Sequence, residues 1–382
     1  MKPLDGIRVL DLSRVLAGPY ATALMADLGA EIIKIEPPQG DDYRHIGPFR
    51  DGESALFTLN NRGKQSLALD LKDPGHLRIA QAIAARVDVV VENFRPGVAA
   101  RLGLGADALR AENPGLIYCS VSGFGQQGPF CDLPAYDLVV QAMSGLMAGT
   151  GEEGGAPLKT GESMADLIAG LFASWSIMAA LVQRGRTGQG ATLDVAMYDA
   201  LFSMLTTSHA LHFYAGQVPQ RVGNRHPLST PFGCFATRDG QVVIAVLSSR
   251  QFAALAALIG APGAADDPRF ASDEARTAHE PEVRALIENW SRGLSTDQAV
   301  AALTGAGIPT APIWDIAQAA DNAHAQAREL VSQLPHATLG TAPSVGQPVR
   351  FDGAKPIAAR SAPQLGGDLH AVLRQFGLED HA

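Results

Sequence analysis

The chain has 382 residues, of which 46% are hydrophobic and 18% are charged, with 40 glycines and 24 prolines. This composition excludes a disordered, collagen-like or coiled-coil protein, and the length predicts two domains or one very large one. The net charge of −9, from 30 Lys and Arg against 39 Asp and Glu, excludes nonspecific binding to nucleic acid or to an anionic membrane, so an anionic ligand requires a local basic site.

The N-terminus lacks a charged region followed by an apolar one, so we expect no targeting segment. The longest apolar stretch, 167–182, is shorter than the ~20 residues that span a bilayer, and we interpret it as a buried helix. Cys119, Cys131 and Cys234 form neither a CxxC pair nor a cluster, which argues against a disulfide framework or a zinc site. A cytoplasmic location fits this cysteine usage.

The first 200 residues alternate between short β-branched runs and helical patterns. The predicted strands are 8–12, 31–35, 66–71, 88–91, 116–121 and 192–197. The predicted helices between them are 19–28, 74–87 and 136–147. This order predicts a mostly parallel sheet covered by helices, so we expect an α/β domain over 1–215.

A long helical pattern at 198–215 leads into a turn-rich break at 223–227, which we interpret as a domain boundary. Beyond it we expect a smaller α+β domain over 216–325. Its predicted elements are a hairpin at 232–236 and 241–247 and helices at 251–259, 280–290 and 296–303. The last segment, 326–382, is expected to return to the first domain, with an extended run at 348–351 and a helix at 368–376.

A GxGxxG motif at 123–128 follows a predicted strand. A dinucleotide-binding fold needs this loop to open directly onto a helix, yet Pro129 and a Cys-Asp-Leu-Pro stretch follow it. We interpret the motif as a structural loop, and a nicotinamide-dependent oxidoreductase stays as a remote alternative.

The first predicted strand is followed by the stretch 13–19, in which Pro19 suits a helix start. Backbone N–H groups there are able to face an anion or oxyanion, although an ordinary strand–helix turn explains the same pattern. Basic residues at predicted element ends either converge on a polyphosphate or lie on the surface as solvated charges. They are Arg14, Arg62, Lys64, Lys72, Arg95 and Arg101.

Asp166 stands directly before the long apolar stretch. Such a carboxylate either caps the helix N-terminus or is held in an apolar site as a nucleophile, and both readings stay open at this point. His209 and His212 lie three apart but lack a nearby acidic ligand, so we predict no metal site.

Taken together, several blocks of the sequence resemble the family III CoA-transferases, also called the CaiB/BaiF family, over essentially the whole chain. The blocks are 11–19, 27–38, 91–97, 186–190, 223–227 and 363–366. The resemblance implies an interlocked homodimer, with a large Rossmann-like domain built from both termini and a small middle domain. It also implies that 223–227 forms a wall of the active site, and that no cofactor is needed beyond coenzyme A.

The resemblance implies that Asp166 is the nucleophile. Its carboxylate would attack the thioester of an acyl-CoA donor, for which succinyl-CoA is the candidate. CoA would then pass through anhydride and aspartyl-CoA thioester intermediates to a small carboxylic acid. Backbone N–H groups of Leu16 and Ala17 would stabilise the oxyanion. The CoA contacts of the family fall here on Leu69, Lys72, Asn93, Phe94, Arg101 and Leu102.

The α-methylacyl-CoA racemases share this fold and use a His–Asp pair where this chain has Tyr136 and Asp137. A phenol with a pKa near ~10 is a poor base for an α-proton, so racemisation is the second hypothesis. A non-catalytic CoA-binding protein is a further alternative.

Formyl-CoA:oxalate enzymes carry Gln where Leu16 stands and have a glycine lid with no counterpart at 216–260, which argues against formate and oxalate chemistry. They also carry a basic residue where Pro37 stands. We therefore expect Arg14 or Arg44 to hold the nucleotide end of CoA.

Overall fold

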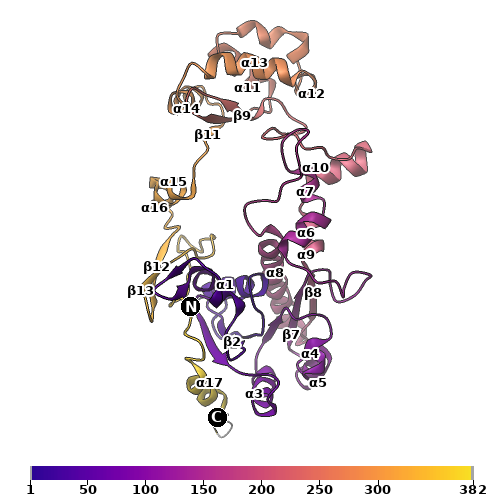
Figure 1. Ribbon diagram of the computed structural model, residues 1–382, viewed down its shortest axis with the longest axis vertical. Coiled ribbons are helices and arrows are strands. Elements are labelled where there is room, and N and C mark those ends of the chain that lie inside the picture. The colour runs from indigo at the N-terminus through magenta and orange to yellow at the C-terminus, as the bar shows by residue number, and fades with distance from the viewer. Residues whose placement is uncertain (1, 380–382) are drawn as a thin grey trace. The chain divides into compact units, whose positions relative to one another are not determined.

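The computed structural model describes residues 2–379. The chain divides into two units (Figure 1). The first unit is built from the segment up to residue 147, from 159–214 and from residue 323 onward. The second contains 148–158 and 215–322, so a short piece from within the first 215 residues groups with the middle of the chain.

A six-stranded parallel sheet forms the centre of the first unit, in the order β5-β2-β1-β6-β7-β8. These strands are β1 (Arg8–Asp11), β2 (Glu31–Glu36), β5 (Lys64–Ala68), β6 (Val89–Glu92), β7 (Ile117–Ser122) and β8 (Thr192–Ala196). All neighbouring pairs are parallel, which confirms the predicted α/β fold with a parallel central sheet. The chain moves outward in one direction from β1 and in the other from β6, so the strand order reverses between them.

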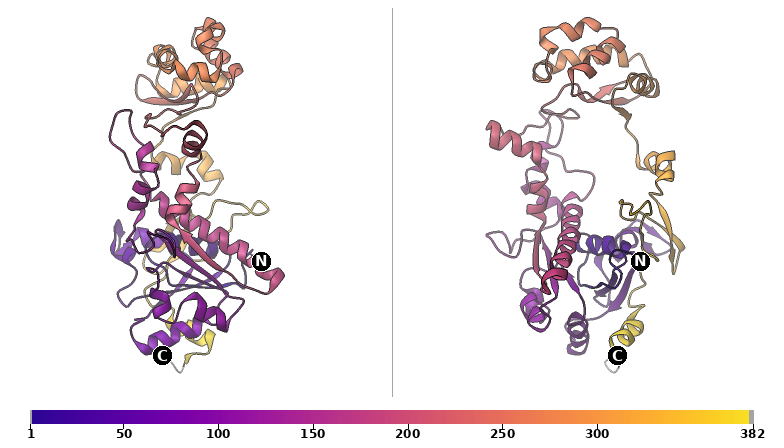
Figure 2. Two further views of the ribbon diagram at one scale, coloured as in Figure 1. Left: turned by 90° about the vertical axis from the view of Figure 1, so that its right-hand side faces the viewer. Right: turned by 180° about the vertical axis from the view of Figure 1, so that it is seen from behind.

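Helices cover both faces of this sheet because its strands are apolar on both sides. Val9 of β1 faces a core shared with α1 (Ala17–Asp27), α8 (Met164–Thr187) and α9 (Met197–Ser203). The next residue, Leu10, faces a second core shared with α3 (Pro74–Ala84), α5 (Ala106–Glu112) and α17 (Leu369–Phe376). The two layers can be followed in Figure 2. The C-terminal helix therefore completes a layer that the first third of the chain begins.

Short elements connect these layers. They are η1 (Asp42–His45), β3 (Phe49–Arg50), β4 (Glu53–Ser54), α2 (Ala55–Asn60), α4 (Val98–Arg101), α6 (Asp137–Met143), α7 (Leu146–Gly149), α10 (Thr206–His209), α16 (Ala323–Ala327), β12 (Ser332–His336) and β13 (Gly340–Ser344).

The second unit has an antiparallel sheet in the order β11-β10-β9, flanked by helices. Its elements are β9 (Phe232–Ala236), β10 (Gln241–Ala245), α11 (Ser249–Leu258), η3 (Pro262–Asp266), η4 (Pro268–Phe270), α12 (Asp273–Ala278), α13 (Glu280–Ser291), α14 (Thr296–Gly305), β11 (Thr310–Pro312) and α15 (Ile316–Asp321). Val242 and Ile244 of β10 pack against Leu255 and Leu303 in one apolar core. The predicted hairpin and the three predicted helices of this region are confirmed.

The helix predicted over 198–215 is helical for most of its length but is not continuous. α9 ends at Ser203, the short helix α10 follows, and a π-helix, η2 (Ala210–Tyr214), continues from it. Leu205 leaves the helical conformation with ψ 51°, and the following Thr-Thr-Ser run has low helix propensity. The predicted helix over 136–147 is likewise interrupted after Met143, because Gly145 adopts a positive φ of 97°.

The C-terminal segment also differs from the prediction. Of the extended run expected at 348–351, only Phe351 pairs, in an isolated bridge with Ala354. The antiparallel hairpin of β12 and β13 was not expected, because Pro335 and Pro343 interrupt both strand patterns.

Helix α8 is buried along one face only, so the prediction of a buried helix holds for half of its surface. Ala169, Ala173 and Ile177 are fully buried, whereas Trp175 on the other side is 61% exposed. With 24 residues, α8 has the length and apolar composition that would allow it to cross a membrane, a property that helices in protein cores share.

Candidate active site

A cavity of about 180 Å³ opens at the carboxyl ends of β1, β6 and β7 in the first unit. Its lining includes residues of the loops after these strands and Asp166 of α8. In open parallel sheets, ligands bind outside the carboxyl ends of the strands where the strand order reverses. The reversal between β1 and β6 places this cavity at that position.

Asp166 lies in the first turn of α8 and lines the cavity. Burial, together with the negative charge of Asp137, raises the pKa of the Asp166 carboxyl to about 7 from its ordinary value of 3.8. A carboxylate in such a site is poorly solvated when it is ionised, which is typical of an activated group rather than of a surface charge.

Asp137 caps helix α8. Its Oδ1 accepts a hydrogen bond from the backbone N–H of Ala165 at 2.8 Å, and its Oδ2 accepts one from Nε2 of Gln141 at 2.7 Å. Gln141 in turn accepts the backbone N–H of Thr160 at 3.0 Å. The capping role considered for Asp166 thus falls to Asp137, and the Asp166 side chain has no hydrogen bond to any other residue between 2 and 379.

The N-terminus of α1 forms another wall of the cavity. Leu16 is its N-cap and provides no side-chain cap, while Tyr20 N–H donates to the carbonyl of Leu16 at 2.8 Å. Within the described part of the chain, the backbone N–H groups of Leu16 and Ala17, the predicted oxyanion donors, and that of Gly18 have no protein acceptor. Free amides at a helix N-terminus bind anions, so this wall is able to stabilise a negative oxygen.

Helices α1 and α8 are in direct contact near this wall. A Cβ atom placed on Gly170 would lie 2.6 Å from the carbonyl oxygen of Ala17. Only glycine permits this approach, which fixes the N-terminus of α1 against the helix that carries Asp166. The predicted oxyanion-binding residues and the predicted nucleophile therefore share one cavity.

A second cavity, of about 340 Å³, lies beside the carboxyl ends of β1 and β2. Four of the residues predicted to contact CoA line it: Leu69, Lys72, Phe94 and Leu102. Arg14 and Phe94 line both cavities, so the two share a border.

Asn93 lines the first cavity, where its amide clamps the backbone of Arg14. Its Oδ1 accepts the Arg14 N–H at 2.9 Å and its Nδ2 donates to the Arg14 carbonyl at 2.8 Å. Arg101 is exposed at the end of α4 and lines neither cavity. Of the six CoA contacts that the resemblance implies, five thus line the two cavities, and Arg14, expected to hold the nucleotide end, lines both.

Both readings offered for Arg62 and Lys64, contact with a polyphosphate and a solvated surface charge, are wrong, because the two side chains are buried in ion pairs. Arg62 donates to Asp27 with Nη2 at 2.7 Å and Nε at 3.0 Å. Lys64 donates to Oδ2 of Asp11 at 2.9 Å and is fully buried. Neither cation faces a ligand.

Arg44 is also unavailable to the nucleotide. It forms a two-point ion pair with Glu36, at 2.7 and 2.8 Å, beneath the surface. Arg14 is exposed and makes only a solvent-exposed ion pair with Asp42 at 3.4 Å. Arg95 lines the first cavity and has no ion-pair partner among the described residues. At the first cavity, Arg95 is therefore placed to meet an anion, and Arg14 is placed to do so if it gives up its exposed pair with Asp42.

Tyr136 lines the first cavity with 74% of its surface exposed. No sequence pattern singled out a second tyrosine, Tyr43. Burial and the charges of Asp166, Asp41 and Asp137 raise the pKa of Tyr43 to about 12, so its phenol stays protonated. A neutral phenol near Asp166 is a hydrogen-bond donor rather than a base.

The GxGxxG motif forms part of a loop between β7 and α6, and no helix begins until Asp137. The interpretation as a structural loop is confirmed. Within residues 2–379, no three His, Cys, Asp or Glu side chains are grouped in a way that could hold a metal ion.

The family model named CoA-transferase family III matches residues 4–369 of the chain. The chain belongs to CoA-transferase family III. It is 41% identical to the acetyl-CoA:oxalate CoA-transferase of Acetobacter aceti, over 98% of this chain and 96% of the relative. It is 38% identical to the succinate–glutarate CoA-transferase of Agrobacterium fabrum, over the same shares of the two chains.

Solved structures place this CoA-transferase in the same family. A CaiB/BaiF family protein from Brucella suis superimposes with a TM-score of 0.87 at 35% identity, covering 98% of this chain and 99% of that one. A protein from Mycobacterium tuberculosis superimposes with a TM-score of 0.87 at 31% identity, over 97% of this chain and 99% of that one. The resemblance to the CaiB/BaiF family is thus confirmed.

Proposed function

We propose that this family III CoA-transferase moves CoA from an acyl-CoA donor to a small carboxylic acid through covalent intermediates on Asp166. The observation that carries the proposal is the position of Asp166. Its carboxyl, with a pKa raised to about 7, lines a cavity whose other wall offers the free amides at the start of α1. A carboxylate nucleophile facing oxyanion donors suits acyl transfer.

In the first half of the reaction, a carboxylate oxygen of Asp166 attacks the thioester carbonyl of the donor. The C–S bond breaks and CoA departs as the thiolate. A mixed anhydride between the acyl group and Asp166 remains. The thiolate then attacks the Asp166 carbonyl carbon and releases the donor acid as a carboxylate. CoA is now joined to Asp166 as a thioester.

In the second half, the carboxylate of the acceptor acid attacks this aspartyl thioester and expels the thiolate, which gives a second anhydride. The thiolate attacks the acyl carbonyl of the acceptor, and the C–O bond to Asp166 breaks. The new acyl-CoA leaves and the Asp166 carboxylate is regenerated. No oxidant, reductant or net proton is consumed.

Each of these steps passes through a tetrahedral oxyanion. The N–H groups of Ala17 and Gly18 are available to it because no protein acceptor among the described residues occupies them. Removing one such donor costs on the order of 100- to 1000-fold in kcat in other enzymes. The proposal therefore assigns the oxyanion site to the start of α1, with Leu16 as its N-cap.

We place CoA along the two bordering cavities. The thioester lies in the first cavity beside Asp166, and the pantetheine and adenine groups lie against Leu69, Phe94 and Leu102 in the second. Lys72 at its rim is placed to meet a phosphate. Arg101 would contact CoA from outside these cavities.

Two properties of the first cavity support a small acid as acceptor. The first cavity is small, at about 180 Å³, and the unpaired guanidinium of Arg95 at its wall suits a carboxylate. A relative is named for acetyl-CoA with oxalate, so oxalate returns to the candidates despite the expectation drawn from Leu16 and the missing glycine lid. A second relative is named for succinate with glutarate, and both pairs are the first to test.

We further propose that the enzyme is a homodimer and works in the cytoplasm. The exposed side of α8 is apolar, with Leu171 54%, Trp175 61% and Val182 59% exposed, and a second copy of the chain is the proposed cover. Three unpaired cysteines suit a reducing compartment.

The test is a CoA-exchange screen read by mass spectrometry. Acetyl-CoA and succinyl-CoA serve as donors against oxalate, glutarate and other small acids, with Asp166→Asn as the matched variant. The proposal predicts a new acyl-CoA from the wild type alone. No exchange from any donor, or equal exchange by Asp166→Asn, would contradict it, and α-proton exchange in D₂O without CoA transfer would favour a racemase.

A further inference from the structure

Val15, which precedes the proposed oxyanion site by one residue, has a left-handed backbone conformation with φ 69°. This region is costly for a β-branched residue, on the order of 1–3 kcal/mol, and persists only where the surroundings enforce it. Val15 lines the first cavity. The conformation at Val15 sets the direction in which the chain enters α1.

The backbone on the N-terminal side of Val15 is held by side chains of other elements. The Ser13 N–H donates to Oδ1 of Asp11 at 2.9 Å, and the Ser13 carbonyl accepts from Nζ of Lys34 at 2.6 Å. Arg14 is clamped at both its N–H and its carbonyl by Asn93, as described above. The loop is therefore fixed by side-chain contacts rather than by backbone pairing.

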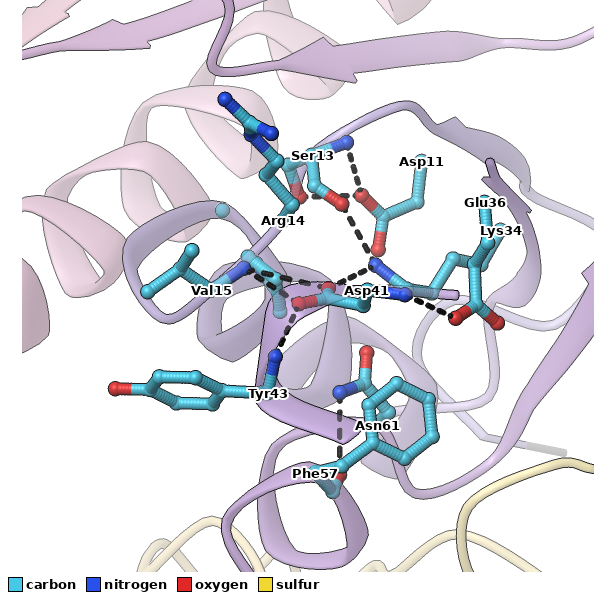
Figure 3. A network of polar contacts seen from close by, with 12 residues as sticks. Asp11, Ser13, Arg14, Val15, Lys34, Glu36, Asp41, Tyr43, Phe57 and Asn61 are labelled. Carbon is cyan, nitrogen blue, oxygen red and sulfur yellow. Dashed lines mark hydrogen bonds and ion pairs between the residues drawn. The ribbon is translucent and has the colours of Figure 1, made fainter. Parts of the chain in front are cut away.

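Asp41 holds Val15 itself. The Val15 N–H donates to both carboxylate oxygens of Asp41, at 3.0 and 3.3 Å (Figure 3). The Asp41 side chain is 1% exposed and forms an ion pair with Lys34 at 2.9 Å. Lys34 therefore connects the carboxylate that holds Val15 to the carbonyl of Ser13.

Asp41 is fixed in turn by its own loop. Its backbone N–H donates to Oε2 of Glu36 at 3.0 Å, and its Oδ1 accepts the N–H of Tyr43 at 3.0 Å. The carboxylate thus stands between an anchored loop after β2 and the strained residue that enters α1. The charge is paired with Lys34, but a buried ion pair is often no more stabilising than apolar packing, so stability alone does not account for the arrangement.

We propose that Asp41 is a positioning residue, which holds Val15 in its left-handed conformation and so aims the amides of Ala17 and Gly18 at the oxyanion. This inference rests on the proposed function and adds to it a residue outside the first cavity. Asp41 lines the second cavity with a side chain that is only 1% exposed, and it acts on the reacting carbonyl through Val15 rather than by contact with the reacting atoms. Its loss lets Val15 relax toward negative φ and turns the start of α1 away from the reacting carbonyl.

The test compares Asp41→Ala with the double variant Asp41→Ala, Val15→Gly. Because misplaced oxyanion donors weaken transition-state binding, we expect Asp41→Ala to lower kcat about 10- to 100-fold, with KM for the acyl-CoA changed less than about threefold. Glycine adopts positive φ without strain, so the double variant needs no carboxylate to hold residue 15. We expect it to recover at least about tenfold of the lost kcat.

Two further variants separate positioning from folding. Asp41→Asn keeps the side-chain volume and one acceptor oxygen, so its kcat should lie between those of wild type and Asp41→Ala. If Asp41→Ala does not fold, Asp41→Asn replaces it, both alone and combined with Val15→Gly. Asp27→Asn breaks another fully buried ion pair of the same unit, away from both cavities. It should lower the unfolding free energy without lowering kcat per folded enzyme.

The outcomes distinguish this inference from the proposed function. Wild-type exchange with unchanged kcat in Asp41→Ala overturns the role of Asp41 alone, as does a double variant no more active than the single one. A wild type that transfers no CoA overturns both. A kcat loss of equal size in Asp27→Asn would show that any broken buried ion pair has this effect, and would also overturn the positioning role.

Discussion

The two ends of helix α1 are built on buried ion pairs, but they leave the backbone in opposite states. At the N-terminal end, the ion pair of Lys34 with Asp41 holds the loop before the helix, while the amides of Ala17 and Gly18 have no acceptor among residues 2–379. At the C-terminal end, the Asp27 carboxylate accepts hydrogen bonds from four donor groups, two on the Arg62 side chain and two on the backbone.

The partners at the C-terminal end are distant in sequence. The Asp27 carboxylate accepts the N–H of Gln347 at 2.8 Å and that of Ala358 at 3.0 Å. This end therefore ties the returning C-terminal segment to the first helix. Under the proposed function, the same kind of buried ion pair supports catalysis at one end of α1 and cohesion of the unit at the other.

The largest effect is expected at the catalytic end. Asp166→Asn removes the proposed nucleophile, so transfer activity should fall by at least about 10⁴-fold, as for other covalent nucleophiles. Initial rates of acyl-CoA exchange measure the loss. Activity within tenfold of wild type would contradict a catalytic role for the site at the N-terminal end of α1.

The next effect concerns the cohesive end. Arg62→Met leaves the fully buried Asp27 carboxylate without its cation, which should lower the unfolding free energy by about 3–5 kcal/mol. The matched control is Arg184→Met, which breaks a partly exposed ion pair with Asp88 and should cost only about 0–1 kcal/mol. Urea unfolding measures both, and equal losses would contradict a special role for the Asp27 centre.

A third substitution acts on the contact between α1 and α8. Gly170→Ala places a Cβ 2.6 Å from the Ala17 carbonyl oxygen, so the helices must separate. Overpacking of this kind costs about 1–3 kcal/mol, and a shift of about 1 Å at the oxyanion site can cost about 100-fold in rate. Gly185→Ala, on the same helix with open space around it, is the control. A Gly170→Ala enzyme with wild-type kcat would show that this contact does not set the site.

The smallest effect is a pH dependence. The folded-state pKa of Asp166, about 7, lies above its ordinary value of 3.8, so the folded protein binds more protons than the unfolded chain between these values. The unfolding free energy from this group must therefore fall as the pH rises from about 4 to 7. Because the nucleophile must be ionised, kcat/KM should rise through about pH 7.

Asp166→Asn removes the titrating group, and with it the contribution of this group to the pH dependence of stability and of kcat/KM. Relative to wild type, it should gain about 1–2 kcal/mol in unfolding free energy between pH 4 and pH 8, after allowance for solvent screening of a partly exposed group. Urea titrations at the two pH values measure this. A wild-type stability that does not fall relative to the variant would contradict the raised pKa.

Much of the first unit could be predicted from its sequence because its buried strands are short apolar runs. β1, β2, β6 and β7 all lie within about two residues of their predicted positions. β5 begins two residues before its prediction, at Lys64. A lysine is seldom buried without an ion-pair partner, so its presence argues against a buried strand. The partner of Lys64, Asp11, lies far away in the sequence.

The same reason limits the prediction of the site. Asp166, Leu16 and Ala17 were found through family blocks, since a lone carboxylate or a strand–helix turn has no unique meaning. Asp41 and Tyr43 gave no signal, because their roles depend on contacts with Val15 and on the charge of Asp166. Only the folded chain brings these groups together.

The most direct test of the central claim is to trap CoA on Asp166. Wild type is incubated with a donor acyl-CoA and no acceptor, digested under acid conditions, and analysed by peptide mass spectrometry beside Asp166→Asn. We predict that the wild-type peptide containing Asp166 gains the mass of CoA less one water, and that the variant peptide gains none. Exchange-competent enzyme that carries no CoA on this peptide, or carries it on another residue, would contradict the account.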